Sequence, residues 1–477
     1  MIPESILLKK SNASIAVIED EKEWTYAEFT EHVYRSATFF RRNNITKILI
    51  DLPQGFHSYA IMWGAYISGT IFCPINNISP DARKEYFILQ FEPDLIISKC
   101  DYLFETTCKF KVSPLIIYSD TLEYDKAESK IIPEDKTAYV IFTSGSTGLP
   151  KGVIVSRNSL ENFLKWSTEE YGIQANDRWA QYSNLGFDLS ICDIFTVIIC
   201  GGTLVTFKEV SEKLFPGNFI KRKQIKFWHS VPTVINLLSE RGHVTNEMLG
   251  HLKVMTFCGE PLLPFQIKLL FEANRNLIVY NTYGPTEGTI FCTFLKMTID
   301  NYEQYCEKTV SIGASIPGYH MRLENIVENV GEIIILGNYI SNGYLNDGHS
   351  NTSFSKEMYN GELTKVYHTG DFGYYINNNL YFAYRKDSQI KISGHRIDLT
   401  EIDHCIREFG YKVCITIYQN KKIISFIKSN TLEENDLREY LRRKLPVYYS
   451  PNLIIRKEAF PYSENNKIDI SELSKSI

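Results

Sequence analysis

The sequence predicts a layered α/β fold followed by a smaller α+β module, and three observations carry this prediction. The chain has 477 residues, which is too long for one ordinary hydrophobic core. Its first third alternates helical patterns with short apolar strands, which is typical of a mostly parallel sheet covered by helices. After about residue 385 the pattern changes to short strands and two helices.

The expected elements of the first third follow from their apolar spacing. They are a helix over 24–42, a strand over 47–51, a helix over 58–68, and strands over 70–74, 94–98 and 115–118. Strand-length apolar runs separated by helices favour a parallel arrangement. No internal repeat or low-complexity tract interrupts this order.

The C-terminal part is expected to form a compact α+β module of about 90 residues. Strands are expected over 389–393, 395–399, 413–418 and 423–427, and a second helix over 432–445. Thr400-Glu-Ile-Asp403 has the pattern of a capping box, so a first helix is expected to begin there and to continue through Arg407. Because no Gly/Ser-rich linker precedes the module, a tight hinge is expected.

Composition excludes several classes of function. The net charge of -5 and the pI near 6.1 give no general attraction to nucleic acid or to an anionic membrane. The longest apolar stretch, 194–205, contains Thr196 and the Gly201-Gly202 pair, so we expect a buried segment and no membrane span. Ten cysteines without a C-x-x-C pair, and no signal peptide, indicate reduced thiols in a cytoplasmic protein.

The stretch 141–152 reads IFTSGSTGLPKG and has the groups that a phosphate site needs. It combines backbone N–H groups, hydroxyls and the Lys151 ammonium. It is not a P-loop, because Lys151 lies between Pro150 and Gly152, and its flanks predict a strand-to-strand turn. A simple turn is the alternative interpretation.

Further motifs follow along the chain in a fixed order. They are FDLS at 187–190, FCGE at 257–260, NTYGPTE at 281–287, YHTGD at 367–371, RKD at 385–387, QIKISG at 389–394 and NKID at 466–469. Each motif alone is weak evidence and could be an ordinary turn, but together they are specific. Over nearly its whole length the chain resembles the adenylate-forming (ANL) superfamily, in particular its amino-acid adenylation domains.

This resemblance implies a large multi-sheet N-terminal domain over 1–385 and a small mobile α+β domain over 386–477, hinged near Asp387. It also implies an ATP site with Mg²⁺ on Glu287, since oxygen ligands suit this cation. Thr286 would contact the α-phosphate, and Lys467 would bridge the substrate carboxylate and that phosphate. The remaining nucleotide contacts would be Thr143, Ser144, Ser146, Thr147, Lys151, Gly259, Glu260, Asn281, Thr282, Tyr283, Asp371, Arg385 and Arg396.

Asp188 indicates which carboxylate is activated. A buried, unpaired carboxylate is costly, so Asp188 in a pocket calls for a cation such as an α-ammonium group. If its segment is helical, Asp188 and Cys192 share a face, and a plain helix cap is the alternative. By resemblance, the side-chain pocket would comprise Leu189, Cys192, Thr256, Cys258, Thr282, Ile290 and Phe291. None is charged, so a small or modest uncharged amino acid is expected, with alanine as the candidate, because the motifs resemble stand-alone D-alanine:carrier-protein ligases.

A second step is implied by the same resemblance. The small module would rotate about Asp387, withdraw Lys467 and bring the Gly394 region to a pantetheine tunnel, where the phosphopantetheine thiol of a separate carrier protein takes the aminoacyl group. Two departures concern backbone geometry, because Tyr384 and Asn466 replace motif glycines. An acyl- or aryl-CoA ligase of the same fold and a non-catalytic nucleotide-binding relative are the alternatives.

Overall fold

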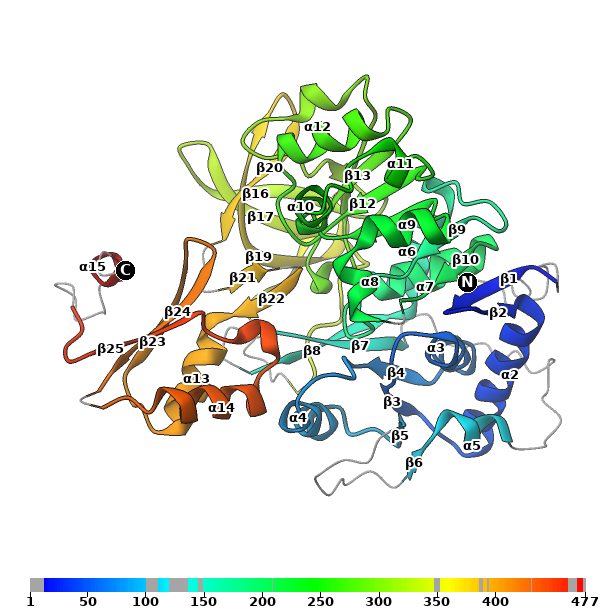
Figure 1. The fold of residues 1–477 in the computed structure, drawn as a ribbon, viewed down its shortest axis with the longest axis horizontal. Coiled ribbons are helices and arrows are strands. Elements are labelled where there is room, and N and C mark those ends of the chain that lie inside the picture. Colours follow the sequence, from blue (N-terminus) through cyan, green and yellow to red (C-terminus); the bar gives the residue numbers. More distant parts are fainter. Residues whose placement is uncertain are drawn as a thin grey trace.

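The computed structural model describes residues 13–99, 110–119, 136–144, 149–207, 209–346, 352–385, 389–392, 394–429, 431–461 and 470–474. Within these residues the strands form five sheets. Figure 1 shows the small orange-to-red C-terminal module beside α4 and β8, while the first 385 residues build the rest of the molecule. This arrangement agrees with the predicted division into a large and a small part.

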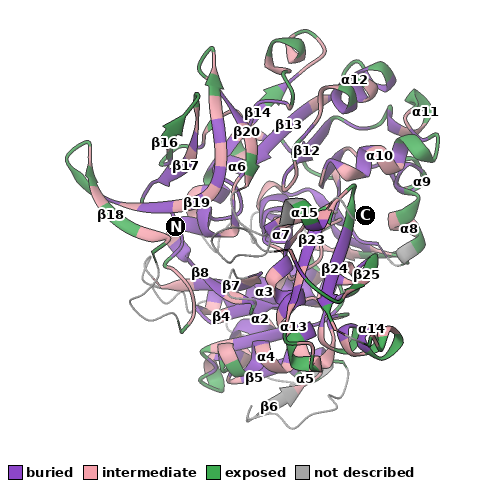
Figure 2. Cartoon of the chain, turned by 90° about the vertical axis from the view of Figure 1, so that its left-hand side faces the viewer, coloured by how far each residue is buried: buried purple, intermediate pink, exposed green. Residues whose placement is uncertain are grey.

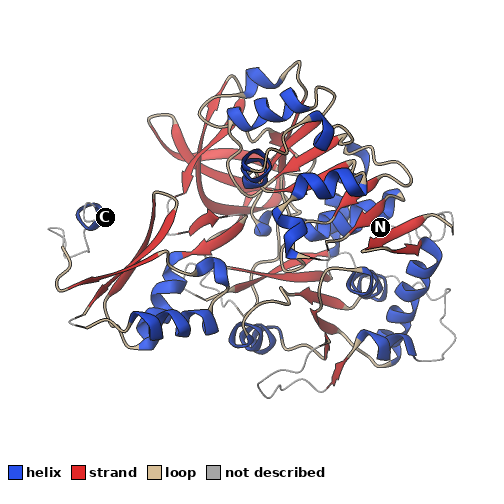
Figure 3. Ribbon diagram, in the orientation of Figure 1, coloured by secondary structure: helices blue, strands red, loops and turns tan. Residues whose placement is uncertain are grey.

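The described helices begin and end as follows. They are α2 (Tyr26–Arg42), α3 (Phe56–Ser68), α4 (Asp81–Phe91), α5 (Pro114–Ser119), α6 (Arg157–Glu170), α7 (Leu189–Cys200), α8 (Val210–Leu214), α9 (Pro216–Lys223), α10 (Thr233–Glu240), α11 (Asn246–Leu249), α12 (Pro264–Ala273), α13 (Leu399–Phe409), α14 (Glu434–Lys444) and α15 (Ile470–Ser474), with 3-10 turns at Thr286–Gly288, Tyr302–Tyr305 and Val447–Tyr449. Figure 3 shows several of these helices against the strands of the two large sheets.

The first large sheet has the described order β15-β14-β13-β12-β11-β9-β10-β1-β2 and is parallel from β1 through β13. Its strands are β1 (Ile15–Glu19), β2 (Lys22–Thr25), β9 (Arg178–Ala180), β10 (Thr203–Val205), β11 (Phe227–Ser230), β12 (Val254–Phe257), β13 (Ile278–Tyr283), β14 (Thr293–Met297) and β15 (Ala314–Ser315). The parallel strands β12 and β13 end at the two motifs that begin at Phe257 and Asn281. The carboxyl edge of this sheet is where ligands bind in open α/β folds.

The second large sheet has the described order β6-β5-β3-β4-β7-β8. Its strands are β3 (Lys47–Asp51), β4 (Ile71–Pro74), β5 (Leu95–Ser98), β6 (Phe110–Val112), β7 (Thr137–Thr143) and β8 (Lys151–Ser156). The last two form an antiparallel hairpin in which Thr143 lies opposite Lys151. The strand-to-strand prediction for this stretch is therefore confirmed.

The prediction of a strand over 115–118 is wrong, because this segment lies in the short helix α5. The edge of the sheet is taken by β6, which pairs in parallel with β5. Pro114 begins α5, a position at which proline loses no helical hydrogen bond. The apolar run alone could not distinguish a buried strand from a helix.

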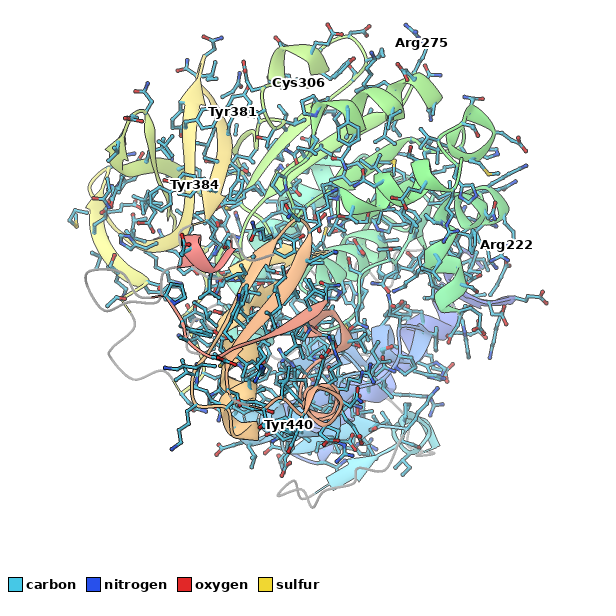
Figure 4. The ribbon with its side chains drawn as sticks, turned by 60° about the vertical axis from the view of Figure 1, so that its left-hand side comes forward. Arg222, Arg275, Cys306, Tyr381, Tyr384 and Tyr440 are labelled. Atoms are coloured by element: carbon cyan, nitrogen blue, oxygen red, sulfur yellow. The ribbon has the colours of Figure 1, made fainter. Side chains whose placement is uncertain are left out.

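An antiparallel sheet follows, with β16 (His320–Val327), β17 (Val330–Leu336), β18 (Phe354–Tyr359), β19 (Glu362–Ile376) and β20 (Asn379–Arg385). Tyr384, one of the glycine replacements, stacks on Phe372 at 5.2 Å between ring centroids and is 53% exposed. Figure 4 shows it on the β19–β20 hairpin together with Tyr381. The tyrosine therefore finds a packing partner on the strand surface.

The small module consists of β21 (Gln389–Ile392), β22 (His395–Asp398), α13, β23 (Cys414–Gln419), β24 (Lys422–Lys428), α14 and β25 (Leu453–Lys457). It has its own core around Ile402, Ile406 and Leu437. The expected capping box at Thr400 is wrong, because Asp398 is the N-cap and accepts a hydrogen bond from the Thr400 amide. The sequence reading missed β25, which pairs in parallel with β24.

Figure 2 shows buried residues concentrated on the strands and on the helix faces that cover them. The apolar stretch 194–205 covers the second half of α7 and strand β10, and most of it is buried, as predicted. In the part of the chain that the structure describes, no helix has the length and apolar character needed to cross a membrane. Buried thiols are found at Cys73, Cys192, Cys258, Cys292, Cys405 and Cys414, and none of them forms a disulfide.

Candidate active site

A cavity of about 340 Å³ lies between the large part and the small module. Of the predicted site residues it is lined by Thr143, Ser144, Asp188, Leu189, Cys258, Gly259, Thr286, Ile290, Asp371, Arg385 and Arg396. These residues come from motifs spread over more than 250 positions of the chain. The fold therefore brings these eleven predicted residues around one cavity.

The side of the site that is predicted to bind phosphate lies where β7 ends and β8 begins. Ser144 lines both the main cavity and a second cavity of about 300 Å³, which Lys151, Arg385 and Arg396 also line. The Lys151 ammonium lies 4.9 Å from the centre of the Tyr344 ring. Hydroxyls and three cations around one space suit a polyanion. Ser146 and Thr147 lie outside the described residues.

The nucleotide side is organised by Asp371, which is almost completely buried. Tyr283 Oη donates to its Oδ2 at 2.8 Å, and Arg385 Nη1 donates to its Oδ1 at 2.7 Å. Burial raises the pKa of Asp371, but Arg385, Lys391 and Tyr283 together leave that pKa below its usual value. Asp371 is therefore an ionised acceptor with free lone pairs on both oxygens.

A narrow cavity of about 30 Å³ continues from this point along β13. Its walls include the predicted Gly259, Glu260, Asn281, Thr282 and Tyr283. The Asn281 side-chain amide donates to the Ser311 carbonyl at 2.8 Å, which fixes its orientation. A tyrosine ring and a fixed amide beside a cavity are groups that suit an aromatic base.

Glu287 is the predicted metal ligand and is completely buried. Arg396 Nη1 lies 3.1 Å from its Oε2 and 3.3 Å from its Oε1, and Tyr344 Oη donates to Oε1 at 2.7 Å. Burial raises the pKa of Glu287, but Arg396 and Tyr344 outweigh burial and leave it below its usual value. With Arg396 on both carboxylate oxygens, Glu287 does not offer a Mg²⁺ site in this arrangement.

Asp188 lines the cavity and is 8% exposed. It occupies the N-cap position of α7, as the helix-cap interpretation expects, but its side chain makes no capping hydrogen bond. Its Oδ2 accepts no hydrogen bond from the described residues. Burial raises the pKa of Asp188 to about 6, with a further increase from Glu287 and opposition from Thr286. None of the groups that chiefly set this pKa is a cation. The Asp188 carboxylate is therefore available to a positively charged group of a ligand.

The residues of the predicted side-chain pocket fall into two groups. Leu189, Cys258 and Ile290 line the cavity. Cys192, Thr256, Thr282 and Phe291 are buried and do not line it. Phe291 packs edge-on against Phe163 at 4.9 Å. The residues of this set that border the cavity are uncharged.

The backbone at the wall of this pocket has an unusual conformation. Thr289 and Ile290 have φ values of 67° and 70°. Both are β-branched residues, for which the left-handed region is strongly unfavourable. Strain of this kind is held by the surrounding structure and is concentrated at functional sites. Here it places Ile290 at the cavity.

The small module contacts the large part at several points around the cavity. The Gly394 amide donates to Glu260 Oε1 at 2.9 Å, and the buried Arg83 and Glu401 form an ion pair at 2.5 Å. His395 stacks on Tyr448 at 3.7 Å between ring centroids. Lys467, Asn466 and the expected hinge Asp387 lie outside the described residues.

Some residues of the site were missed by sequence reasoning. Tyr344, Gln389 and Lys391 line one or more of the cavities, and Val231 meets the module at Gly394. Lys391 and Gln389 lie within a motif that was noticed in the sequence, which was the available signal. Tyr344 follows a turn-rich segment without periodicity, and nothing marked it.

Comparison with known proteins agrees with this geometry. The AMP-binding enzyme family matches residues 8–345. The D-alanine--D-alanyl carrier protein ligase of Staphylococcus aureus strain MRSA252 is 28% identical over 97% of this chain and 96% of its own.

Solved structures share the fold over almost the whole chain. The Vibrio cholerae adenylation domain AlmE, solved in complex with glycyl-adenosine-5'-phosphate, has a TM-score of 0.83 at 24% identity and covers 99% of this chain and 96% of its own. NpsA-ThdA of Klebsiella oxytoca, an artificially fused adenylation-PCP di-domain, has a TM-score of 0.84 at 18% identity, with 95% and 93% covered. The protein is a member of the AMP-binding enzyme family.

Proposed function

We propose that this protein activates an amino acid with ATP as an aminoacyl-AMP, releases pyrophosphate, and then transfers the aminoacyl group to the phosphopantetheine thiol of a separate carrier protein. One observation carries the proposal. The available Asp188 carboxylate lines the same cavity as the phosphate-side residues Thr143 and Ser144 and the nucleotide-side residue Asp371. An α-ammonium group on Asp188 brings the substrate carboxylate towards the α-phosphorus.

The chemistry requires positioning and charge stabilisation. In the first step a carboxylate oxygen attacks the α-phosphorus of ATP, and the bond to the β-phosphate oxygen breaks. In the second step a thiolate attacks the acyl carbonyl, and AMP leaves. In this proposal Lys151 and the hairpin hydroxyls receive the leaving pyrophosphate, while Asp371 holds the ribose. Thr286, which lines the cavity, contacts the α-phosphate.

The substrate side chain is proposed to be small and uncharged, with alanine as the candidate. The lining beside Asp188 supports an uncharged side chain, because Leu189, Cys258 and Ile290 offer no partner to a charged one. The names of the relatives support it as well, since one is a ligase for D-alanine and another was solved with a glycyl adenylate.

We assign the observed arrangement of the small module to the second step. Gly394 approaches Glu260 and Val231, and its φ of 79° is in the left-handed region. In this proposal the small domain comprises 386–477 and turns about Asp387 to bring Lys467 into the cavity for the first step. The carrier arm would then enter beside Gly394 when the module returns. Mg²⁺ is proposed to accompany ATP, and the cytoplasm is the proposed compartment because it keeps the buried thiols reduced.

A pyrophosphate-exchange assay tests the function. The purified protein is assayed with ATP, labelled pyrophosphate and separate panels of D- and L-amino acids, fatty acids and aryl acids. We expect exchange with small uncharged amino acids and none with the other acids. Exchange with fatty or aryl acids instead would identify an acyl- or aryl-CoA ligase, and no exchange with any acid would contradict an enzymatic role.

The Gly394→Ala variant is predicted to lose transfer and to keep adenylation. A Cβ at this position would lie 2.3 Å from Val231 Cγ1, and the left-handed backbone disfavours alanine. We expect aminoacyl transfer to a carrier protein to fall about tenfold or more, because such backbone strain costs about 1–2 kcal/mol before the clash is added. Pyrophosphate exchange should be unchanged.

The double variant Gly394→Ala/Val231→Ala serves as the control. It removes the clash and leaves the backbone strain, so transfer should recover in part. Transfer at the wild-type rate in the single variant would show that the contact between Gly394 and Val231 has no part in the second step.

A further inference from the structure

The carboxylate of Glu287 is bound from two sides by different parts of the chain. Tyr344, which comes from the large part, donates to Oε1 at 2.7 Å. Arg396, which comes from β22 of the small module, lies within 3.3 Å of both oxygens. The carboxylate is completely buried, so these contacts are its environment. The oxygens that a metal would bind are thus facing a guanidinium of the small module.

Arg396 is held in this position by its own module. Its Nε donates to Gln389 Oε1 at 2.7 Å, across the β21–β22 pair. Gln389 Nε2 in turn lies 3.2 Å from Asp398 Oδ2. The guanidinium is therefore aimed before it meets Glu287, and its approach depends on where the small module sits.

The small module is held against the large part by contacts on both sides of the cavity, and we call this its seated position. The Gly394 amide contacts Glu260, and Arg83 of α4 pairs with Glu401 of α13. The Arg83 and Glu401 side chains are both at most 10% exposed, so separating them exposes two charges at once. The seated position is thus a discrete state with specific contacts, and Arg396 reaches Glu287 within it.

A divalent cation and Arg396 cannot share Glu287. Mg²⁺ and Mn²⁺ bind carboxylate oxygens directly, and Mg²⁺ does so at about 2.0–2.1 Å. Arg396 Nη1 lies within hydrogen-bond distance of both oxygens, so a metal on either oxygen would stand against the guanidinium. Repulsion between two cations is strong in a buried site, whereas the buried carboxylate needs one of them.

We propose that Glu287 exchanges cations between the two steps, binding a divalent metal when the small module is away and Arg396 when the module is seated. Metal on Glu287 and the seated module exclude each other, so release of the metal with pyrophosphate permits the module to seat. Arg396 is a positioning residue in this scheme, and Gln389 aims it. The inference rests on the proposed function in two respects, the arrival of the metal with ATP and the movement of the small module.

Metal affinity provides the first test. Mn²⁺ is titrated by electron paramagnetic resonance into the full chain with α,β-methylene-ATP, which cannot be cleaved at the α–β bridge. We expect Arg396→Ala to bind Mn²⁺ about tenfold more tightly than wild type, because a competing charged hydrogen bond is removed. Gln389→Ala should show a smaller increase, and it keeps the test available if Arg396→Ala fails to fold. Arg442→Ala, at an exposed arginine of α14, is the charge-matched control and should equal wild type.

Hydrogen exchange provides the reciprocal test, because coupling between two binding events is mutual. In wild type with the same nucleotide analogue, Mn²⁺ should accelerate amide exchange over 394–398 and in α13, where the seating contacts lie. This effect does not depend on which acid the enzyme activates, so failure of the proposed substrate would leave the test intact. The inference would be overturned by equal Mn²⁺ affinities in wild type and Arg396→Ala, or by exchange over 394–398 that does not respond to Mn²⁺.

Discussion

Replacing Lys467 by alanine is expected to lower amino-acid-dependent pyrophosphate exchange by a factor of about 10² to 10³, the usual effect of removing one charge-stabilising donor from a reacting centre. The lysine is proposed to neutralise charge that develops between the substrate carboxylate and the α-phosphate. Nucleotide binding should survive, because Asp371 keeps the hydrogen bonds that Tyr283 and Arg385 donate to it. Exchange kinetics and calorimetric titration with ATP measure the two quantities.

The second step separates this role from a general structural one. With Gly394 seated at the cavity, as in the structure, the lysine is not required, so transfer from preformed aminoacyl-AMP to the carrier should be retained in Lys467→Ala. Lys422→Ala, at an exposed lysine of the same module, is the matched control and should behave as wild type in both assays. Unchanged exchange in Lys467→Ala would remove this residue from the mechanism.

The sequence predicted the elements that depend on local interactions, and it did not predict those that depend on contacts between distant residues. Strand β3 was predicted residue for residue, since its signal is local, and the β7–β8 hairpin followed from the two runs that flank the phosphate loop. The prediction of a strand over 115–118, where α5 lies, was wrong because β6 takes the sheet edge beside β5. No local sequence pattern indicates which segment pairs there. The predicted N-cap of α13 was wrong by two residues, because Asp and Thr side chains can both accept hydrogen bonds from the first amide groups of a helix.

The candidate site shows even more clearly that contacts between distant residues cannot be predicted from local sequence patterns. Its chemistry was carried by motifs, and Asp188, Asp371 and Glu287 were named from them. The pairing of Glu287 with Arg396 and Tyr344 joins positions far apart in the sequence, so only the folded chain reveals it. The left-handed backbone of Ile290 was equally hidden, because a β-branched residue gives no signal for that conformation.

Asp188→Asn is expected to lower kcat/KM for the amino acid by a factor of about 10² to 10³, since breaking one partner out of a buried ion pair costs about 3–5 kcal/mol. Asparagine keeps the shape of the side chain and removes the charge that attracts the α-ammonium group. ATP binding should not change, because Asp188 has no expected contact with the nucleotide. Asp436→Asn, at an exposed acid of α14, is the matched control.

The pH dependence gives this prediction its sharpest form. The pKa of Asp188 is raised to about 6, so kcat/KM for the amino acid should fall as the pH drops through 6 and the free carboxyl takes up a proton. Stability should move in the opposite direction. A group whose folded pKa lies above its unfolded value opposes folding when ionised, so Asp188→Asn should melt at a higher temperature than wild type at pH 7.5, and the difference should shrink towards pH 5. A variant with wild-type kcat/KM and no gain in melting temperature would show that Asp188 is neither buried as a lone charge nor used to bind the substrate, whereas the paired loss of activity and gain of stability is what a carboxylate kept for an incoming cation must produce.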